Sequence, residues 1–287
     1  QSNTIAMSVN DAVLLFLPKA EQRTVCIIAG AVTAALVGIV ILGGIQRIGK
    51  ASEIIVPFMA IGYIAICIIV LSRFGSRILP AFRDIFSGAL GIKQAVGGAA
   101  GFGAARALRI GMARGVYSNE AGVGSAPMAH ACANTNDPVK QGMYGIFEVF
   151  ADTIVMCTMT ALVVLASGIP LQACGEISGT SIALRAFSTV LPERTTGIFL
   201  AVSMLLFAYT SLLGWAVYGM QCAKYLFGKR AQLPFCILYT VLTFAGALMK
   251  VDFVWTAGET LNYLMAAPNM LALLVLNREV RRETAFA

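Results

Sequence analysis

The stretch TVCIIAGAVTAALVGIVIL, residues 24–42, decides the class of this protein. It contains no charged residue, and its nineteen residues are close to the length that an α-helix needs to cross a bilayer. Residues 54–71 are a second uncharged stretch of the same kind. Between the two lie Gly43-Gly44, which predicts a helix stop, and Arg47–Lys50, which predicts a basic loop. We therefore expect two antiparallel membrane-spanning helices.

The composition of the whole chain agrees with this class. Of its 287 residues, 58% are hydrophobic and 12% are charged, and the mean hydropathy is +0.80. Soluble domains carry about 25% charged residues. The net charge of +7 is divided among short segments between apolar stretches, which is typical of membrane proteins and not of a nucleic-acid-binding face. The composition excludes a water-soluble fold, argues against a nucleic-acid partner and predicts a lipid bilayer as the solvent.

Five further stretches complete the predicted set of spans. Four are long and apolar and one is short and rich in glycine: residues 142–167, 197–223, 233–249, 251–276 and 97–105. A partial helix lies near the N-terminus, residues 72–93 predict a helix on the membrane surface, and residues 168–196 predict a loop. The prediction is an all-α integral membrane protein with about seven spans plus a partial helix.

The basic residues predict the orientation of these spans. If the spans alternate in direction, the segments near residues 47, 114, 140, 229 and 281 share one side of the membrane, and they hold more than half of the Lys and Arg residues. An excess of basic residues marks the cytoplasmic side. We therefore expect a multi-pass protein of the cell (inner) membrane with these segments in the cytoplasm.

Residues for covalent catalysis are scarce in this sequence. His130 is the only histidine, and most of the seven cysteines are scattered through apolar stretches. This pattern favours small buried side chains over a disulfide framework or a metal site. The segment Ser118–Pro127 is rich in glycine but lacks the Gly-Lys-Ser/Thr ending of a phosphate-binding loop. We expect neither an enzyme nor a cofactor.

Residues 97–103, GGAAGFG, are the first candidate site. Each glycine in a helix costs about 0.8–1 kcal/mol relative to alanine, so four in seven residues indicate a special requirement. Unwound backbone in a span exposes carbonyl and amide groups that bind ions and polar ligands. A close-packed interface of small residues explains the same pattern. Both interpretations remain open on composition alone.

Two adjacent hydroxyl residues in a later span are the second candidate site. Thr210 and Ser211 offer hard oxygen ligands to an alkali cation, and Trp215 lies one helical turn after Ser211 on the same face. The structural alternative is that the hydroxyls bond back to carbonyls of the preceding turn, and that Trp215 simply packs.

Acidic residues inside apolar stretches form a third group. Glu148 and Asp152 are one turn apart in one span, and Glu259 shares a stripe with Asn262 and Asn269 in the last. Ionisable residues at membrane depth are functional by default. A structural hydrogen bond to the neighbouring loop explains Glu148 and Asp152 equally well, and for the last span we favour polar contacts between helices.

The longest recognisable motif is RIGMARGVYSNEAGVGSAPMAHA, residues 109–131. Together with Glu148–Thr153, Cys157–Ala161 and Pro268-Asn269, it resembles the alanine or glycine:cation symporter family. The resemblance covers nearly the whole chain. It implies a leucine-transporter-like bundle of two inverted five-helix repeats, with residues 1–287 as a single transporter domain. On this basis the chain is a fragment that runs from the third to the tenth family helix.

The function implied by the resemblance is secondary active transport. A small neutral amino acid, alanine or glycine, enters with sodium by alternating access, and the oligomeric state is not predicted. A proton-coupled amino-acid permease is the main alternative, in which Glu148, Asp152 or Glu259 takes over coupling. A sodium channel is a weaker alternative, because a channel needs a continuous polar pore.

The resemblance also assigns roles to individual residues. The substrate pocket contains the predicted residues Gln1, Gly98, Gly101, Phe102, Ser211 and Trp215. Thr210 and Ser211 are the predicted sodium ligands, and no other metal is expected. The predicted gate loop contains Ser118, Asn119, Glu120, Gly122 and Ser125. The sequence departs from the family pattern at positions that affect pocket size, namely Ala99, Phe102, Gly103, Arg106 and Met220, and this leaves the choice of substrate open.

Overall fold

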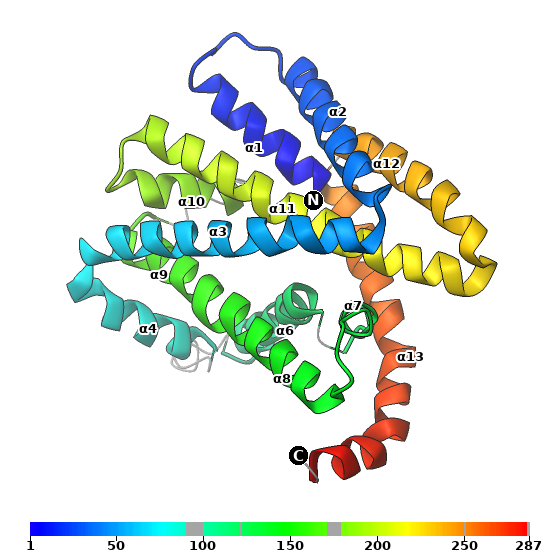
Figure 1. Cartoon of the computed structure of the whole chain (residues 1–287). Helices are drawn as coiled ribbons and strands as arrows, with labels where there is room; N and C mark the ends of the chain where they lie inside the picture. The colour runs from blue at the N-terminus through cyan, green and yellow to red at the C-terminus, as the bar shows by residue number, and fades with distance from the viewer. Residues whose placement is uncertain (90–99, 121, 171–178, 250, 286–287) are drawn as a thin grey trace. The chain divides into compact units, whose positions relative to one another are not determined.

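The computed structural model describes residues 1–89, 100–120, 122–170, 179–249 and 251–285. Within these ranges every regular element is a helix and none is a strand, as expected for an all-α membrane protein (Figure 1). The chain divides into two compact units. Unit 1 comprises residues 1–66 and 171–256, and unit 2 comprises residues 67–170 and 257–287.

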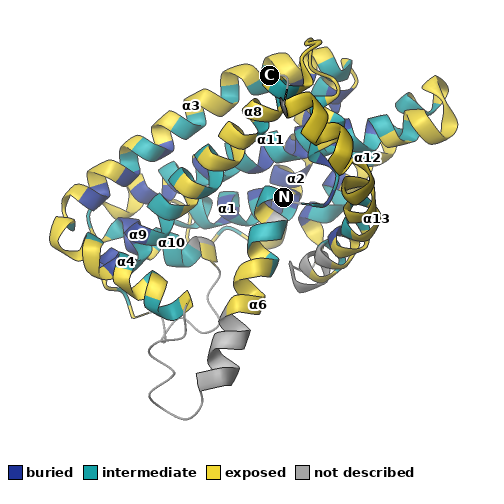
Figure 2. Cartoon of the chain, turned by 90° about the horizontal axis from the view of Figure 1, so that it is seen from below, coloured by how far each residue is buried: buried dark blue, intermediate teal, exposed yellow. Residues whose placement is uncertain are grey.

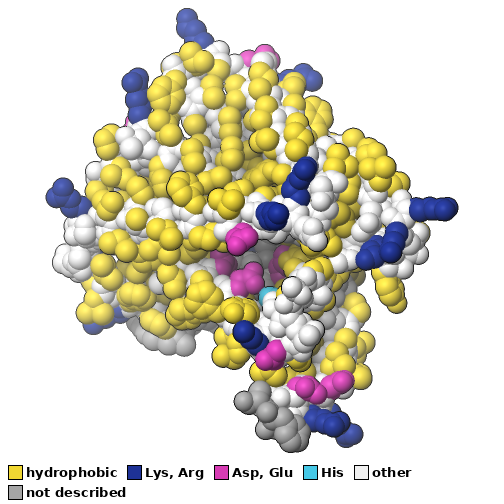
Figure 3. All heavy atoms as spheres, in the orientation of Figure 1, with side chains coloured by type: hydrophobic (Ala, Val, Ile, Leu, Met, Phe, Trp, Pro, Cys, Tyr) yellow, Lys and Arg dark blue, Asp and Glu magenta, His cyan; other side chains and the backbone are white. Residues whose placement is uncertain are grey.

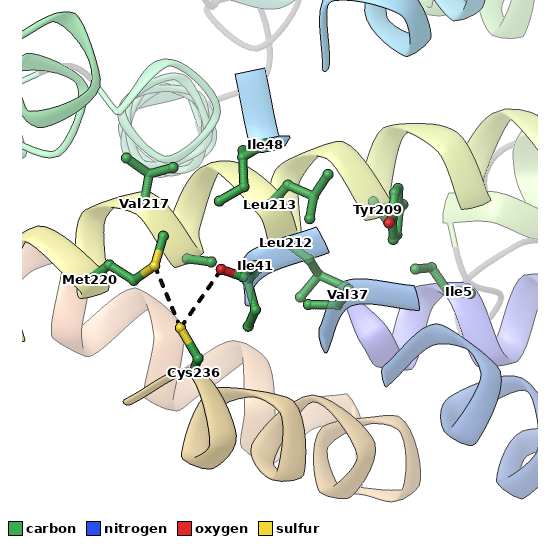
Figure 4. Packing of buried hydrophobic residues seen from close by; sticks show 12 residues of the cluster. Ile5, Val37, Ile41, Ile48, Tyr209, Leu212, Leu213, Val217, Met220 and Cys236 are labelled. Atoms are coloured by element: carbon green, nitrogen blue, oxygen red, sulfur yellow. Dashed lines mark hydrogen bonds between the residues drawn. The ribbon is translucent and has the colours of Figure 1, made fainter. Parts of the chain in front are cut away.

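Unit 1 is built from long apolar helices. They are α1 (Ser2–Leu14), α2 (Gln22–Ile41), most of α3 (Gly44–Ser72), α10 (Gly179–Ser188), α11 (Glu193–Phe227), the short 3₁₀ helix η3 (Lys229–Ala231) and α12 (Gln232–Leu248). The core lies where α1, α2, α11 and α12 meet, and Figure 4 shows the apolar side chains that fill it. Its fully buried members include Ile5, Val37 and Leu213.

Two tyrosines satisfy their hydroxyl groups inside this core. Tyr209 Oη donates to the Leu36 carbonyl at 3.1 Å, and Tyr239 Oη donates to the Leu212 carbonyl at 2.7 Å. Each bond joins two different helices, because a buried hydroxyl without a partner is costly. On another side of α11, Tyr63 packs against the rings of Phe199 and Phe207, whose centroids lie 6.0 and 5.6 Å away.

Small residues allow α2 and α12 to approach closely. A Cβ atom added at Gly30 would lie 2.7 Å from the Ala247 Cβ, and one added at Gly38 would lie 3.1 Å from the Thr240 side chain. Small residues at helix contacts are the usual means of close packing inside a bilayer. The glycines of residues 24–42 therefore have a packing role that the apolar pattern alone does not predict.

We expect Gly30→Val to destabilise unit 1 by about 1–3 kcal/mol, because the added side chain overlaps Ala247 in a packed contact. Thermal unfolding of the detergent-solubilised protein measures the effect. Gly62→Val in α3 is the matched control, since nothing lies within 4 Å of a Cβ added there. Equal melting temperatures for the two variants would contradict this account of the α2–α12 contact.

Unit 2 carries the shorter and more polar elements. They are α4 (Gly75–Ala89), α6 (Ala100–Asn119), α7 (Ala126–His130), α8 (Pro138–Val149), the π-helix η1 (Phe150–Cys157), α9 (Thr158–Ser167) and most of α13 (Val251–Ala285). α4 packs on α9, where Arg77 Nη1 donates to the Ala166 carbonyl at 3.3 Å. This bond satisfies a carbonyl group in the last turn of α9, which ends at Gly168 with φ +74°.

The outer helix faces are apolar. On α3, Ile54, Phe58 and Ile61 are 74%, 73% and 69% exposed and follow one another at helical spacing. Figure 2 shows many exposed positions along α3, α8 and α13, and Figure 3 shows hydrophobic side chains over much of the face in view. Exposed apolar stripes of this extent are expected where helices face lipid.

Six segments in the described part of the chain are long and apolar enough to cross a membrane. They are Gln22–Ile41, Gly44–Ser72, Pro138–Ser167, Glu193–Phe227, Lys229–Leu248 and Thr256–Thr284. These six coincide with six of the seven predicted spans. The seventh, residues 97–105, falls partly outside the described residues, and its described part begins α6 at Ala100.

Three local predictions were wrong or incomplete. Arg47–Lys50 is not a loop but the second turn of α3, where Arg47 Nη1 reaches back to the Ile39 carbonyl at 3.0 Å. The predicted loop 168–196 contains α10. The span over residues 142–167 is interrupted by the π-helix η1, which the sequence pattern did not indicate.

Candidate functional site

The predicted pocket residues are divided between the two units. Gln1, Thr210, Ser211 and Trp215 belong to unit 1, and Gly101 and Phe102 belong to unit 2. Gly98 lies outside the described residues. Gly101 and Phe102 are in the first turn of α6. The two parts of the predicted pocket are therefore described separately.

Both predicted sodium ligands lie in the middle of α11. Thr210 Oγ1 donates to the carbonyls of Leu206 and Phe207, each at 3.0 Å, and Ser211 Oγ donates to the Phe207 carbonyl at 3.0 Å. These are the back-bonds that the structural alternative predicted. In these bonds both hydroxyl groups act as donors, so the lone pairs of their oxygens remain available. A cation binds through such lone pairs. The geometry is thus compatible with either role.

Trp215 follows the hydroxyls by one turn of α11. Its ring meets the Tyr218 ring edge-on, with the centroids 5.6 Å apart, and its side chain is half-buried. Leu212, Leu213 and Ala216 on the neighbouring positions are buried in the core. α11 therefore places one face in the core, while Thr210, Ser211 and Trp215 occupy half-buried positions beside it.

Gln1 lies at the N-cap position of α1, and its carbonyl accepts a bond from the Ile5 amide at 3.0 Å. Close to it, Asn3 Nδ2 donates to the Met249 carbonyl at 2.8 Å. This bond holds the start of α1 against the end of α12. The role of Asn3 was not predicted, because it depends on a residue 246 positions away.

Ser118 and Asn119 of the predicted gate loop are not loop residues but the last residues of α6, and the chain of unit 2 turns sharply after them. Glu120, Gly122 and Gly124 all have positive φ values, of 51°, 74° and 89°. The Ser125 hydroxyl, which is fully buried, donates to the Glu120 carboxylate across the turn. The positive φ values at Gly122 and Gly124 explain these glycines of the motif, since other residues enter this region at a cost.

The last span holds this loop from its other side. Asn269 Nδ2 donates to the Gly122 carbonyl at 3.0 Å, and a Cβ added at Gly124 would lie 2.8 Å from Asn269 Oδ1. Asn269 follows Pro268 inside α13. Asn269 therefore makes a polar contact, but its partner is a loop residue and not a second helix as predicted, and the side chain of Glu259 lies outside what the structure describes.

The π-helix η1 meets the end of α6 through two polar contacts. Ser118 Oγ donates to Asp152 Oδ2 at 3.5 Å, and the Thr153 hydroxyl donates to Asn119 Oδ1. Asp152 thus makes a structural hydrogen bond of the kind that the sequence left open, although its partner lies before the span and not after it. π-helical turns are rare and are frequent at functional sites.

Glu148 is separated from this contact. It is largely exposed, and its carboxylate lies 3.8 Å from His130 Nε2, while Gln141 Nε2 lies 2.8 Å from His130 Nδ1. Glu148 lies in the last turn of α8 and Asp152 in the first turn of η1, and the two acids contact different residues. The acids of this span therefore serve two different local networks.

Three buried polar atoms within the described part of the chain have no hydrogen-bond partner. They are Ser8 Oγ, Asn10 Oδ1 and Ser188 Oγ. Two of them lie on α1 beside Asp11. None was predicted as a site residue, although the pair Asn10-Asp11 inside an apolar stretch is a signal that sequence reasoning could have used.

Comparisons with known proteins agree with the resemblance found in the sequence. The profile described as the sodium:alanine symporter family matches residues 1–285. The "Sodium/alanine symporter AgcS" of Methanococcus maripaludis is 40% identical over 261 residues, which cover 90% of this chain and 56% of that protein. The "Probable sodium/glutamine symporter GlnT" of Bacillus subtilis is 34% identical over 98% of this chain and 55% of that protein.

A third relative differs in its named coupling ion. The "Sodium/proton-dependent alanine carrier protein" of Bacillus sp. strain PS3 is 30% identical over 96% of this chain and 62% of that protein. The chain spans about half the length of the curated relatives that it matches. These relatives are named as symporters or carriers and not as enzymes. Since the family profile matches almost every residue, the chain belongs to the sodium:alanine symporter family.

Proposed function

We propose that the protein imports a small neutral amino acid, alanine or glycine, together with sodium by alternating access. The observation that carries this proposal is the match of the sodium:alanine symporter family over residues 1–285. The name of the Methanococcus maripaludis relative supports alanine and sodium as the transported pair. The glutamine named for GlnT is larger, so substrate size varies among relatives, and pocket size decides the substrate here.

The middle of α11 supports the sodium part of the proposal. Thr210 and Ser211 present two hydroxyl oxygens on adjacent positions, and their protons are already donated to backbone carbonyls. A sodium ion would bind the remaining lone pairs without breaking a hydrogen bond. Trp215, one turn away and in contact with Tyr218, would form an aromatic wall for the substrate. Gln1, Gly98, Gly101 and Phe102 complete the proposed pocket.

Unit 2 supports the alternating-access part. The proposed gate begins with Ser118 and Asn119 at the end of α6, which bond to η1, and continues into a loop whose Gly122 carbonyl accepts from Asn269 of α13. Each of these contacts is a hydrogen bond, and one hydrogen bond contributes about 0.5–1.5 kcal/mol to stability. Such a loop can open and close at low cost, as a gate requires. We propose that Ser118, Asn119, Glu120, Gly122 and Ser125 act as this gate.

Proton coupling is the second candidate function. One observation favours it: relatives at 30% and 32% identity carry sodium and proton together in their names. In that case Asp152, whose carboxylate accepts from Ser118 beside the gate loop, would carry the proton. The proposed fold is a leucine-transporter-like inverted-repeat bundle in the cell membrane, and it is the same for both candidates.

Uptake into liposomes separates these functions. The protein, expressed from its complete gene, is reconstituted and offered labelled alanine under an inward sodium gradient, an inward proton gradient or neither. We expect accumulation with sodium only, and competition by unlabelled glycine. Accumulation with the proton gradient alone would favour the second candidate. No uptake under either gradient would contradict the proposed substrate, and a sodium current without amino acid would indicate a channel.

A further inference from the structure

Unit 1 contains a small, partly open pocket between α1, α10 and α11. Its volume is about 20 Å³, enough for one water-sized particle. The lining includes Ser8 and Asp11 from α1, Leu184 from α10, and Gly197 and Leu200 from α11. The two polar residues are one helical turn apart, so they face the same side of α1. The remaining wall is apolar.

One polar side chain at this pocket, that of Ser8, lacks a hydrogen-bond partner. Ser8 is 4% exposed, and its hydroxyl has no hydrogen-bond partner. The side chain of Asp11 is bonded to that of Asn10, and no Lys or Arg in the described ranges forms an ion pair with it. The Ser8 hydroxyl therefore does not bond the Asp11 carboxylate directly. An unsatisfied buried hydroxyl costs about 1–3 kcal/mol.

A bound cation would stabilise both the Ser8 hydroxyl and the Asp11 carboxylate. The Asp11 carboxylate is half-buried, so a nearby cation would stabilise it, and the neighbouring hydroxyl offers a lone pair to the same ion. A water molecule fits the volume but requires two to four hydrogen bonds, and the apolar wall offers no further polar side chain. One particle that accepts two oxygen ligands and carries positive charge suits the cavity best.

The cavity is separate from the proposed transport site. Ala201, which lines it, lies nine residues before Thr210 on α11. At a rise of 1.5 Å per residue this is about 13–14 Å along the helix. The α11 residues that line it, from Gly197 to Ala201, lie in the second and third turns of that helix.

We infer that Ser8 and Asp11 form a second monovalent-cation site, which takes sodium when the protein transports. This inference rests on the proposed sodium-coupled function. The site explains why an acid and a hydroxyl occur one turn apart in an otherwise apolar wall. It also gives the protein two sodium-binding positions, one at Ser8 and Asp11 of α1 and one at Thr210 and Ser211 in the middle of α11.

The sodium dependence of alanine uptake tests the inference. With two sites, the wild-type Hill coefficient for sodium is expected to exceed 1 and to approach about 2. Asp11→Asn should lower it to about 1 and raise the half-saturating sodium concentration about tenfold or more, as loss of a metal-site group does. Ser8→Ala, which keeps the carboxylate, should raise that concentration by a smaller factor.

A binding measurement without transport accompanies this test. Sodium chloride, in place of choline chloride, should raise the melting temperature of the purified wild type more than that of Asp11→Asn. Ser203→Ala is the matched control. It removes a buried hydroxyl of α11 that does not line the cavity, and it should behave as wild type in both assays.

The outcomes separate this inference from the proposed function. If the wild type shows no sodium-dependent uptake, the proposed function fails, whatever the variants do. If the wild type transports with sodium but Asp11→Asn and Ser8→Ala keep its Hill coefficient and half-saturation, the second site is overturned. A change in pH dependence with unchanged sodium dependence overturns it as well, in favour of a proton. If Asp11→Asn fails to fold, Ser8→Ala alone decides.

Discussion

Sodium-driven uptake should fall by about 10- to 100-fold when Thr210→Val and Ser211→Ala are combined, because the double variant removes both proposed oxygen ligands of the transport sodium. The folded helix should change little. Both hydroxyls donate to carbonyls within α11, at 3.0 Å, and these local bonds add little to helix stability. The loss should appear as a higher half-saturating sodium concentration in the liposome assay, with protein level and melting temperature near those of wild type.

A matched control exists on α12. Thr243 is 5% exposed, and its Oγ1 donates to the Tyr239 carbonyl at 2.8 Å in the same back-bonding geometry. Thr243→Val removes the same chemical group from another helix of unit 1 and should leave the sodium dependence unchanged. If the double variant of α11 and this control had the same half-saturating concentration, Thr210 and Ser211 would have only the structural role.

Gly124→Ala should have the second large effect, a loss of most transport activity together with reduced stability. Gly124 has φ +89°, a region that costs an L-residue about 1–2 kcal/mol. The added methyl group would also lie 2.8 Å from Asn269 Oδ1 and Cγ. Asn269 then has to move, and its bond to the Gly122 carbonyl is lost or weakened. The loop would no longer be held in one position against α13.

Gly111→Ala in α6 provides the comparison for this prediction. Nothing lies within 4 Å of a Cβ added at Gly111, and alanine is favoured over glycine inside a helix. Uptake and melting temperature of this variant should equal or exceed those of wild type. Adding Asn269→Ala to Gly124→Ala should recover part of the lost stability, as a double-mutant cycle measures. Wild-type uptake in Gly124→Ala would contradict the proposed gate.

The long apolar helices were predictable because their length follows from bilayer thickness. Residues 24–42 correspond to α2 (Gln22–Ile41), and residues 197–223 lie inside α11 (Glu193–Phe227). The errors at Arg47–Lys50 have a simple cause. Basic residues have good helix propensity, so after Gly44 nothing in the sequence ends the helix, and the Arg47 side chain satisfies the end of α2.

The parts that sequence reasoning missed depend on contacts between distant residues. The bond from Asn269 to Gly122 joins positions 147 residues apart, and the bond from Asn3 to Met249 joins positions 246 apart. The two bonds that join η1 to the end of α6 each link positions 34 apart. The cavity beside Ser8 requires α10 and α11 to close over one face of α1. Hydrophobic periodicity contains no information on such pairings.

In the candidate site, too, some features were predictable from the sequence and others depend on the folded structure. The sequence located the glycines of the loop 118–125 by a family motif, and the structure adds the physical reason, which is positive φ at Gly122 and Gly124. The hydroxyls of Thr210 and Ser211 were placed correctly inside a helix, but their half-buried position beside the core could not be derived from a single span. Asp11 was missed because it lies in a stretch too short to count as a span.

The central claim is that sodium and the amino acid move together, and a flux measurement tests it most directly. Radioactive sodium entry into proteoliposomes is followed at zero membrane potential, before and after alanine is added outside. The account predicts slow sodium entry without alanine, a marked rise when alanine is added, and no rise in vesicles without protein. Rapid sodium entry that does not depend on alanine, or alanine entry that carries no sodium, would contradict it.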